Sequence, residues 1–313
     1  MKYVECINGL LREQALAHDN LVCFGQNVNA GSCIGGFTKG IAVRPTSRIV
    51  NSTNAENSLC GFGFGLMIRG ANAVFFMKQL DFLLLGIDQL VNTFNIIRNA
   101  ARPPRGSFTI MPIVMDNGWQ GPQSSLNTFA EFCSIASIPG YTVTNQRDAE
   151  SIIRRHMVAP GFRIIAVSQR LFKEEAIAPE RVLYQSGDAS LFQYTDGADA
   201  TIVSFNFAFP QAWSLSQALG EAGIRSSLFN VNSPTPVDWR PIIDDVRRTR
   251  RLVVLDDSKS QNLACHALVA EARRMENLKS DHVFTRHRAA DWLHPVADSF
   301  EVPTTDIVAA LRK

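Results

Sequence analysis

The segment 51–98 combines a solitary acid with a run of glycines, a combination suited to acid–base catalysis. Glu56 is the only carboxylate between Asp19 and Asp81, and it precedes the run GFGFG at positions 61–65. A carboxylate in apolar surroundings can hold or accept a proton at neutral pH, as general acid–base catalysis requires. At the start of a helix the same side chain would instead only favour the positive end of the helix dipole. Residue types alone leave both interpretations open.

The glycines at 61–65 also have two possible uses. Asp81 lies twenty residues after Gly61, which imitates the spacing of a dinucleotide-binding motif. That motif, G-x-G-x-x-G, directly follows a strand, whereas residues 51–57 are polar and typical of the residues before a helix. We therefore expect no nucleotide site at this turn, and we expect the glycines to let one helix pack closely against another backbone.

The run that begins at Glu56 resembles E-x-x-x-x-G-Φ-x-x-G-Φ, the motif of the pyrimidine-binding domain of thiamine diphosphate enzymes, where Φ is apolar. Glu56 falls on the glutamate of the motif and Gly61 and Gly65 fall on its glycines. Phe62 and Leu66 fall on its apolar positions. The segment is thus identified as a candidate cofactor-binding helix.

Further segments resemble, in the same order along the chain, the β subunit of the decarboxylating component of 2-oxo acid dehydrogenases. The resemblance covers nearly the whole chain and extends to the C-terminal half of split transketolases. Besides residues 56–66, the segments that carry it are 37–40 (FTKG), 87–89 (IDQ), 138–140 (IPG), 148–149 (DA), 199–203 (DATIV), 251–254 (RLVV) and 306–310 (DIVAA).

The resemblance implies roles for two residues. Glu56 would hydrogen-bond a pyrimidine ring nitrogen of thiamine diphosphate and promote the imino tautomer that removes the thiazolium proton. An aromatic residue stacks on the pyrimidine in this family, and the ungapped match gives that position to Phe82. Periodicity alone would make Phe82 a core residue of an apolar helix. The cofactor would do the carbon chemistry, while the protein would orient and tune it.

A second family motif, G-D-G followed by N-N, is absent from the sequence; its nearest counterpart is GDA at 187–189. The resemblance therefore implies that an α subunit holds the diphosphate and Mg²⁺, most simply in an assembly of two α and two β chains. We expect no metal ligands in this chain.

Residues 118–125 (GWQGPQSS) resemble a family loop of sequence GPQHS, whose histidine assists acyl transfer to a lipoyl arm. Ser124 stands at the position of that histidine, and no histidine occurs between His18 and His156. We take Gln123 and Ser124 as candidate residues of a substrate loop. The loss of the histidine favours the transfer of an activated aldehyde to a carbonyl acceptor over lipoyl acylation.

The predicted function is therefore that of an enzyme subunit: a β subunit that decarboxylates a 2-oxo acid or cleaves a ketose donor and transfers the activated aldehyde to a carbonyl acceptor. One alternative is a divergent 2-oxo acid dehydrogenase β subunit that acylates a lipoyl domain, with a lipoyl acyltransferase as a further partner. Another is a non-catalytic scaffold or regulatory β-like subunit.

Composition excludes other classes of protein. The 313 residues carry a net charge of +2 and are 46% hydrophobic, so we expect a large core and no nucleic-acid partner. No stretch of about 18 residues is uniformly apolar, so we expect no membrane span. The N-terminus lacks the pattern of a signal peptide, and the six cysteines form no C-x-x-C pair. These features predict a cytoplasmic protein.

Hydrophobic patterning predicts the elements that position these residues. Apolar stretches of strand length alternate with helical stretches along the chain, which is typical of a parallel sheet covered by helices on both faces. The prediction is an α/β fold with two mainly parallel-sheet domains. We place a pyrimidine-binding domain at 1–177, a linker at 178–198 and a transketolase C-terminal-like domain at 199–313. Residues 80–98 are predicted to form one strongly apolar helix.

Overall fold

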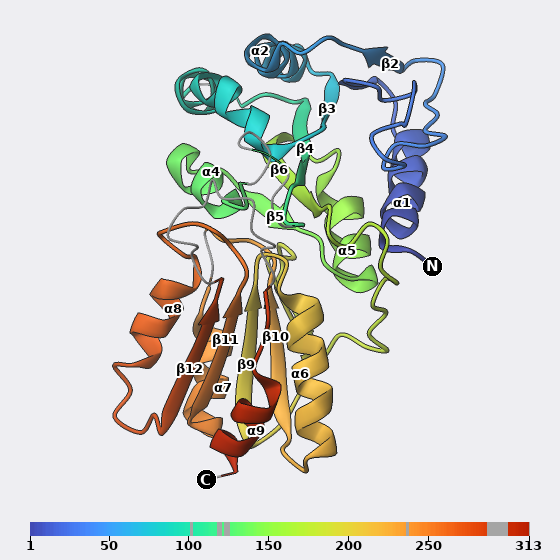
Figure 1. The fold of residues 1–313 in the computed structure, drawn as a ribbon. Coiled ribbons are helices and arrows are strands. Elements are labelled where there is room, and N and C mark those ends of the chain that lie inside the picture. Colours follow the sequence, from blue (N-terminus) through green and yellow to red (C-terminus); the bar gives the residue numbers. More distant parts are fainter. Residues whose placement is uncertain (101–102, 118–120, 122–125, 236–237, 287–299, 313) are drawn as a thin grey trace.

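The computed structural model describes residues 1–100, 103–117, 121, 126–235, 238–286 and 300–312. These residues form two α/β domains, which lie one above the other in Figure 1. Each domain is built on a sheet with six described strands. The first sheet is entirely parallel and the second is mostly parallel, which confirms the predicted fold class.

The first sheet has the strand order β2-β1-β3-β4-β6-β5. Every residue of its central strand β4 is buried, as expected for a parallel strand covered on both faces. The strands are β1 (Leu21–Gly25), β2 (Arg48–Asn51), β3 (Asn72–Met77), β4 (Ser107–Val114), β5 (Gly140–Thr142) and β6 (Gly161–Ser168). The α-helices of this domain are α1 (Tyr3–Ala17), α2 (Glu56–Ile68), α3 (Phe94–Arg98), α4 (Phe129–Ala136) and α5 (Gln146–His156).

Residues 80–98 do not form the single helix that their apolar character predicts. They form a 3₁₀ segment η1 (Leu80–Gly86), a π turn η2 (Gln89–Thr93) and then α3, with a bend of 68° between η1 and the rest. Gly86 lies at the bend, where an added Cβ would come within 2.7 Å of the Cys60 sulfur on α2. The segment therefore packs closely against α2 at Gly86 and bends, instead of continuing as one regular helix.

No single helix in the described ranges is long and apolar enough to span a membrane. The bent pair Leu80–Gly86 and Gln89–Arg98 reaches the necessary length and composition only when its two parts are taken together.

The second sheet has the strand order β12-β11-β9-β10-β8-β7, in which β8 is antiparallel to β10 and β7 is antiparallel to β8. Its strands are β7 (Tyr184–Gln185), β8 (Leu191–Thr195), β9 (Ala200–Phe205), β10 (Ser226–Val231), β11 (Arg251–Asp256) and β12 (Ser280–Thr285). The helices of this domain are α6 (Phe209–Glu221), α7 (Arg240–Thr249), α8 (Cys265–Ala272) and α9 (Thr304–Leu311).

Residues 178–198 are more than the predicted linker. They contain the β7–β8 hairpin, which extends the second sheet at its edge. Leu191, Phe192 and Tyr194 of β8 are buried, so the hairpin contributes side chains to the core. The second sheet therefore begins at Tyr184, inside the segment taken as a connection.

The domains meet through the carboxyl ends of their strands (Figure 1). Thr142, at the end of β5, donates its N–H to the carbonyl of Asn232, just after β10, at 2.7 Å. The Asn232 side chain donates to the carboxylate of Asp148 in α5 at 2.9 Å. Thr144 and Asn230 donate to the same carboxylate. Burial raises the pKa of Asp148 to about 6, so a fully enclosed polar cluster joins the two domains.

Within the first domain, Arg163 in β6 binds main-chain carbonyls at and just after the C-terminal end of α5. Its buried guanidinium donates to the main-chain carbonyls of His156, Ala159 and Pro160. Burial lowers the pKa of Arg163 to about 10. One side chain thus satisfies the His156 carbonyl, which the helix end leaves without an intrahelical donor, and two carbonyls of the turn that follows α5.

Candidate active site

The candidate site lies at the carboxyl edge of the first sheet, where the strand order reverses. β1 pairs in parallel with β2 on one side and with β3 on the other. In open α/β sheets, ligands bind in the crevice outside the carboxyl ends of the strands at such a point. The N–H of Ser52 donates to the carbonyl of Gly25 at 2.9 Å, which holds the chain leaving β2 at this edge. Four residues later it reaches Glu56, the first residue of α2.

Glu56 is a nearly buried carboxylate without a partner. The residue is 9% exposed, and within the described part of the chain its carboxylate makes no hydrogen bond or ion pair. Its oxygens are not among the fully enclosed side-chain atoms that lack a hydrogen bond in the described chain, so they keep some contact with solvent. The carboxylate is therefore free to bind a hydrogen-bond donor from a ligand.

Cys60, one turn after Glu56, is not a second reactive group. Burial, and after it the nearby charge of Glu56, raises the pKa of the Cys60 thiol to about 12. A thiol with such a pKa stays protonated at neutral pH and is a poor nucleophile. Its sulfur fills the space that glycine leaves at Gly86.

Phe82 lies on a segment that packs across the first turn of α2. An added Cβ at Gly86 would lie 2.7 Å from the Cys60 sulfur and 3.5 Å from the backbone oxygen of Glu56, so η1 and the beginning of α2 are in close contact. The Phe82 side chain is half-buried. The structure thus brings the segment of Phe82 onto the helix that begins with Glu56. The stacking role of the Phe82 ring stays a prediction.

The glycines of the GFGFG run have different surroundings. Gly63 lies against the Phe108 ring, where an added Cβ would come to 2.3 Å, so close packing of α2 on the sheet requires glycine. At Gly65 no described atom outside the local helix lies within 4 Å of an added Cβ. The nearby Phe62 is 46% exposed. One face of α2 is therefore packed within the chain and another is open.

Exposed apolar side chains occur on α2 and on two segments that pack against it, η1 and α3. A single exposed apolar residue needs no explanation, but a group of them is typical of a protein–protein contact. The group consists of Phe62 and Ile68 on α2, Leu84 and Leu85 on η1, and Ile96 on α3.

The two candidate substrate-loop residues, Gln123 and Ser124, lie outside the described residues. The first described residue after them is Leu126, whose N–H donates to Oδ1 of Asp81 at 3.0 Å. Asp81 is buried and directly precedes Phe82. The described end of the loop is therefore bonded to the segment that carries Phe82.

Sequence patterns do not predict the charged residues buried at the domain junction. Asp116 follows β4 and Asp257 follows β11, and both are fully buried. Arg170 joins them: its guanidinium pairs with Asp257 at 2.8 Å, and its main-chain N–H donates to Asp116 at 3.0 Å. Their only signal is position, because each acid stands where an apolar parallel strand ends.

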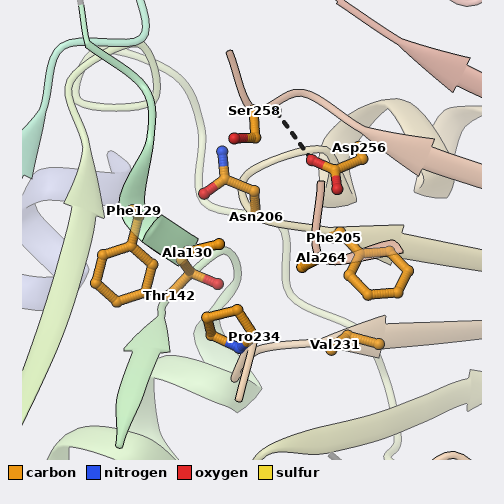
Figure 2. Close-up of a pocket in the computed structure, with 10 residues that line it drawn as sticks. All are labelled: Phe129, Ala130, Thr142, Phe205, Asn206, Val231, Pro234, Asp256, Ser258 and Ala264. Atoms are coloured by element: carbon orange, nitrogen blue, oxygen red, sulfur yellow. Dashed lines mark hydrogen bonds between the residues drawn. The ribbon is translucent and has the colours of Figure 1, made fainter. Parts of the chain in front are cut away.

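A small pocket between the domains lies at the carboxyl edge of the second sheet, apart from Glu56 and Phe82. Asp256 is fully buried there, and its Oδ1 accepts the Ser258 N–H at 3.0 Å. In the described part of the chain its Oδ2 has no hydrogen bond of normal geometry, and burial raises the Asp256 pKa to about 6. Figure 2 shows the lining: Phe129, Ala130, Thr142, Phe205, Asn206, Val231, Pro234, Asp256, Ser258 and Ala264.

Comparisons with known proteins extend the resemblance over both domains. No family model matches the chain. It is 24% identical over 309 residues to pyruvate dehydrogenase E1 component subunit beta-1, mitochondrial, of Arabidopsis thaliana. The aligned part covers 95% of this chain and 83% of that protein. It is 21% identical over 310 residues to pyruvate dehydrogenase E1 component subunit beta of Staphylococcus aureus. Here the aligned part covers 96% of this chain and 94% of that protein.

A solved structure described as split gene transketolase, inactive beta4 tetramer, has the same fold. The TM-score is 0.65 at 15% sequence identity, with 98% of this chain and 96% of that chain covered. The chain resembles a transketolase-like β subunit. This confirms the resemblance that the motifs indicate.

Proposed function

We propose that this chain is the β subunit of a heteromeric thiamine diphosphate-dependent enzyme, which decarboxylates a 2-oxo acid or cleaves a ketose donor and transfers the activated aldehyde to a carbonyl acceptor. The observation that carries the proposal is Glu56, a residue that is 9% exposed and whose carboxylate has no partner in the described chain. It stands at the edge of the sheet where such folds bind ligands. Full-length similarity to pyruvate dehydrogenase β subunits supports the cofactor class.

The residues present fit the pyrimidine end of thiamine diphosphate. Glu56 would accept a hydrogen bond from a ring nitrogen and so favour the imino tautomer. Phe82, on the segment packed against α2, would offer its ring for stacking. When bound, the cofactor supplies the nucleophilic carbon. The residues of this chain would hold its pyrimidine and set the tautomer.

An α subunit would hold the diphosphate and Mg²⁺. The sequence has no G-D-G and N-N motif, and among the described residues no group of three or more His, Cys, Asp and Glu side chains could bind a metal ion. The exposed apolar side chains around α2 and the open face at Gly65 support a partner chain beside the candidate site. Two α and two β chains form the simplest such assembly.

Lipoyl acylation is the second candidate function. It is favoured by the similarity to pyruvate dehydrogenase E1 β subunits, and it would add a lipoyl acyltransferase to the partners. It is disfavoured by Ser124, which stands where the family loop has its histidine. A non-catalytic scaffold is disfavoured by Glu56, whose carboxylate has no partner in the described chain and stands at the edge of the sheet where such folds bind ligands.

The test is to capture the tagged chain from its native cells and to assay the complex with thiamine diphosphate, Mg²⁺ and a panel of 2-oxo acids and ketoses. We expect an α subunit that carries G-D-G and N-N, and cofactor-dependent donor consumption with the product joined to an added aldehyde. Transfer to an added lipoyl domain would instead support the dehydrogenase function. A complex that binds no thiamine diphosphate would refute the proposal.

A further inference from the structure

Residues of the second domain form hydrogen bonds with both polar atoms of the Asn127 side chain and with its main-chain carbonyl. Its Nδ2 donates to the carbonyl of Asp257 at 2.7 Å, and its Oδ1 accepts from Nδ2 of Asn206 at 2.7 Å. Its carbonyl accepts from Oγ of Ser258 at 2.9 Å and from the N–H of Lys259 at 2.7 Å. Asn127 belongs to the first domain by sequence and is fully buried, so the second domain fixes its position.

Asp257 organises the other side of this contact. Its Oδ1 accepts from Nδ2 of Asn206 at 2.8 Å and from the N–H of Phe207 at 2.9 Å. Its Oδ2 accepts from the Arg170 guanidinium at 2.8 Å. Each of these donors is at the carboxyl end of a strand. A buried network in which every polar group has a hydrogen-bond partner is rigid. The loss of one member leaves the others without a partner.

The contact continues from Asn127 to the candidate site. Leu126 is the preceding residue, and its N–H donates to Oδ1 of the buried Asp81 at 3.0 Å. Asp81 belongs to η1 and directly precedes Phe82. A short series of bonds thus joins Asp257 in the second domain to the segment that packs across the beginning of α2.

We propose that Asn127 and Asp257 are positioning residues for Phe82: the second domain holds η1 in place on α2 through Asn127, Leu126 and Asp81. The inference rests on the proposed function only in taking Phe82 as the ring that stacks on the cofactor. The second domain would thus help to position the site. Loss of its hydrogen bonds to Asn127 would release η1 without changing any residue that would touch the cofactor.

The first test is hydrogen–deuterium exchange on the free full-length chain. In Asn127→Ala, amides of residues 80–86 and of Leu126 should exchange at least about tenfold faster, because both buried side-chain hydrogen bonds of Asn127 are lost and the loss of one such bond already promotes local opening about tenfold. Asp245→Asn is the matched control, since Asp245 is a buried acid of the second domain that binds Thr201 and Arg248 away from this contact. It should leave those amides unchanged.

Asn206→Gly is the second variant in case Asn127→Ala does not fold. Glycine keeps the left-handed backbone at this position, where Asn206 has a φ of 57°, and removes the amide that binds Asn127. It should accelerate the same amides. Unchanged exchange over 80–86 in both variants would overturn the proposal, as would equal acceleration in Asp245→Asn.

The second test measures thiamine diphosphate affinity in the captured complex by equilibrium titration. Asn127→Ala should raise the Kd about tenfold, with kcat at saturating cofactor nearly retained, because Asn127 positions the site and does not react. A role limited to stability would lower the unfolding midpoint and leave the Kd unchanged, which contradicts the proposal. If the wild-type complex binds no cofactor, the proposed function fails, and the exchange experiment still decides whether the second domain holds η1.

Discussion

Replacing Asp256 by asparagine should change how the stability of the chain depends on pH. Burial raises the pKa of Asp256 from 3.8 to about 6. Because the folded-state pKa lies above the unfolded one, ionisation is disfavoured in the folded chain. Below about pH 4 the carboxyl group hardly lowers the free energy of unfolding. The loss of unfolding free energy grows as the pH rises to about 6 and is constant above that. A shift of about two units corresponds to about 3 kcal/mol.

The assay is urea unfolding of the wild type and Asp256→Asn at pH 4 and pH 8. Asparagine keeps an Oδ1 acceptor for the Ser258 N–H, and any constant effect of the substitution cancels between the two pH values. Asp148, whose pKa burial also raises to about 6, titrates in both proteins and cancels as well. From pH 4 to pH 8 the wild type should lose about 2–3 kcal/mol relative to the variant. Parallel pH profiles of the two proteins would refute the reasoning.

Three further substitutions test the packing around the site and the end of α5. Gly63→Ala should lower the unfolding free energy by about 1–3 kcal/mol, because the new methyl group meets the Phe108 ring at 2.3 Å; an unchanged urea midpoint would contradict this. Gly65→Ala should add about 1 kcal/mol of helix stability to the free chain and weaken co-purification of the α subunit; full recovery of the partner would show that this face is not at the contact. Arg163→Met should destabilise the chain by about 3 kcal/mol, because the carbonyl of His156 at the end of α5 and two carbonyls of the following turn lose their donor. Wild-type stability in urea would argue against that role.

The sequence predicts the layers of the fold because they depend on local apolar patterns. β4 is mostly apolar and every one of its residues is buried, and alternation with helices suffices to predict a parallel sheet. The segment 80–98 is different, since its apolar composition does not record the contact of Gly86 with Cys60 that bends it. The β7–β8 hairpin is missed for a similar reason: β8 pairs with β10, which follows it by about thirty residues.

The candidate site is predictable only where a motif carries it. Glu56 and Phe82 follow from the resemblance, and the structure places their segments in contact. The junction is not predictable in this way, because its partners are far apart in sequence: Arg170 binds Asp116 across 54 residues and Asp257 across 87. An acid after an apolar strand indicates a position at the sheet edge, but it does not indicate which basic residue will reach it.

The most direct measurement of the central claim compares Glu56→Gln with the wild type in the assembled complex. Glutamine is nearly the same size as glutamate, so the variant chain should fold and bind its α subunit as before. Donor consumption should fall at least about 100-fold, since the carboxylate that sets the tautomer is lost, and the near-ultraviolet circular dichroism of the bound cofactor should change with it. Glu56→Asp should retain part of both signals. A Glu56→Gln complex with wild-type turnover and an unaltered cofactor spectrum would contradict the account.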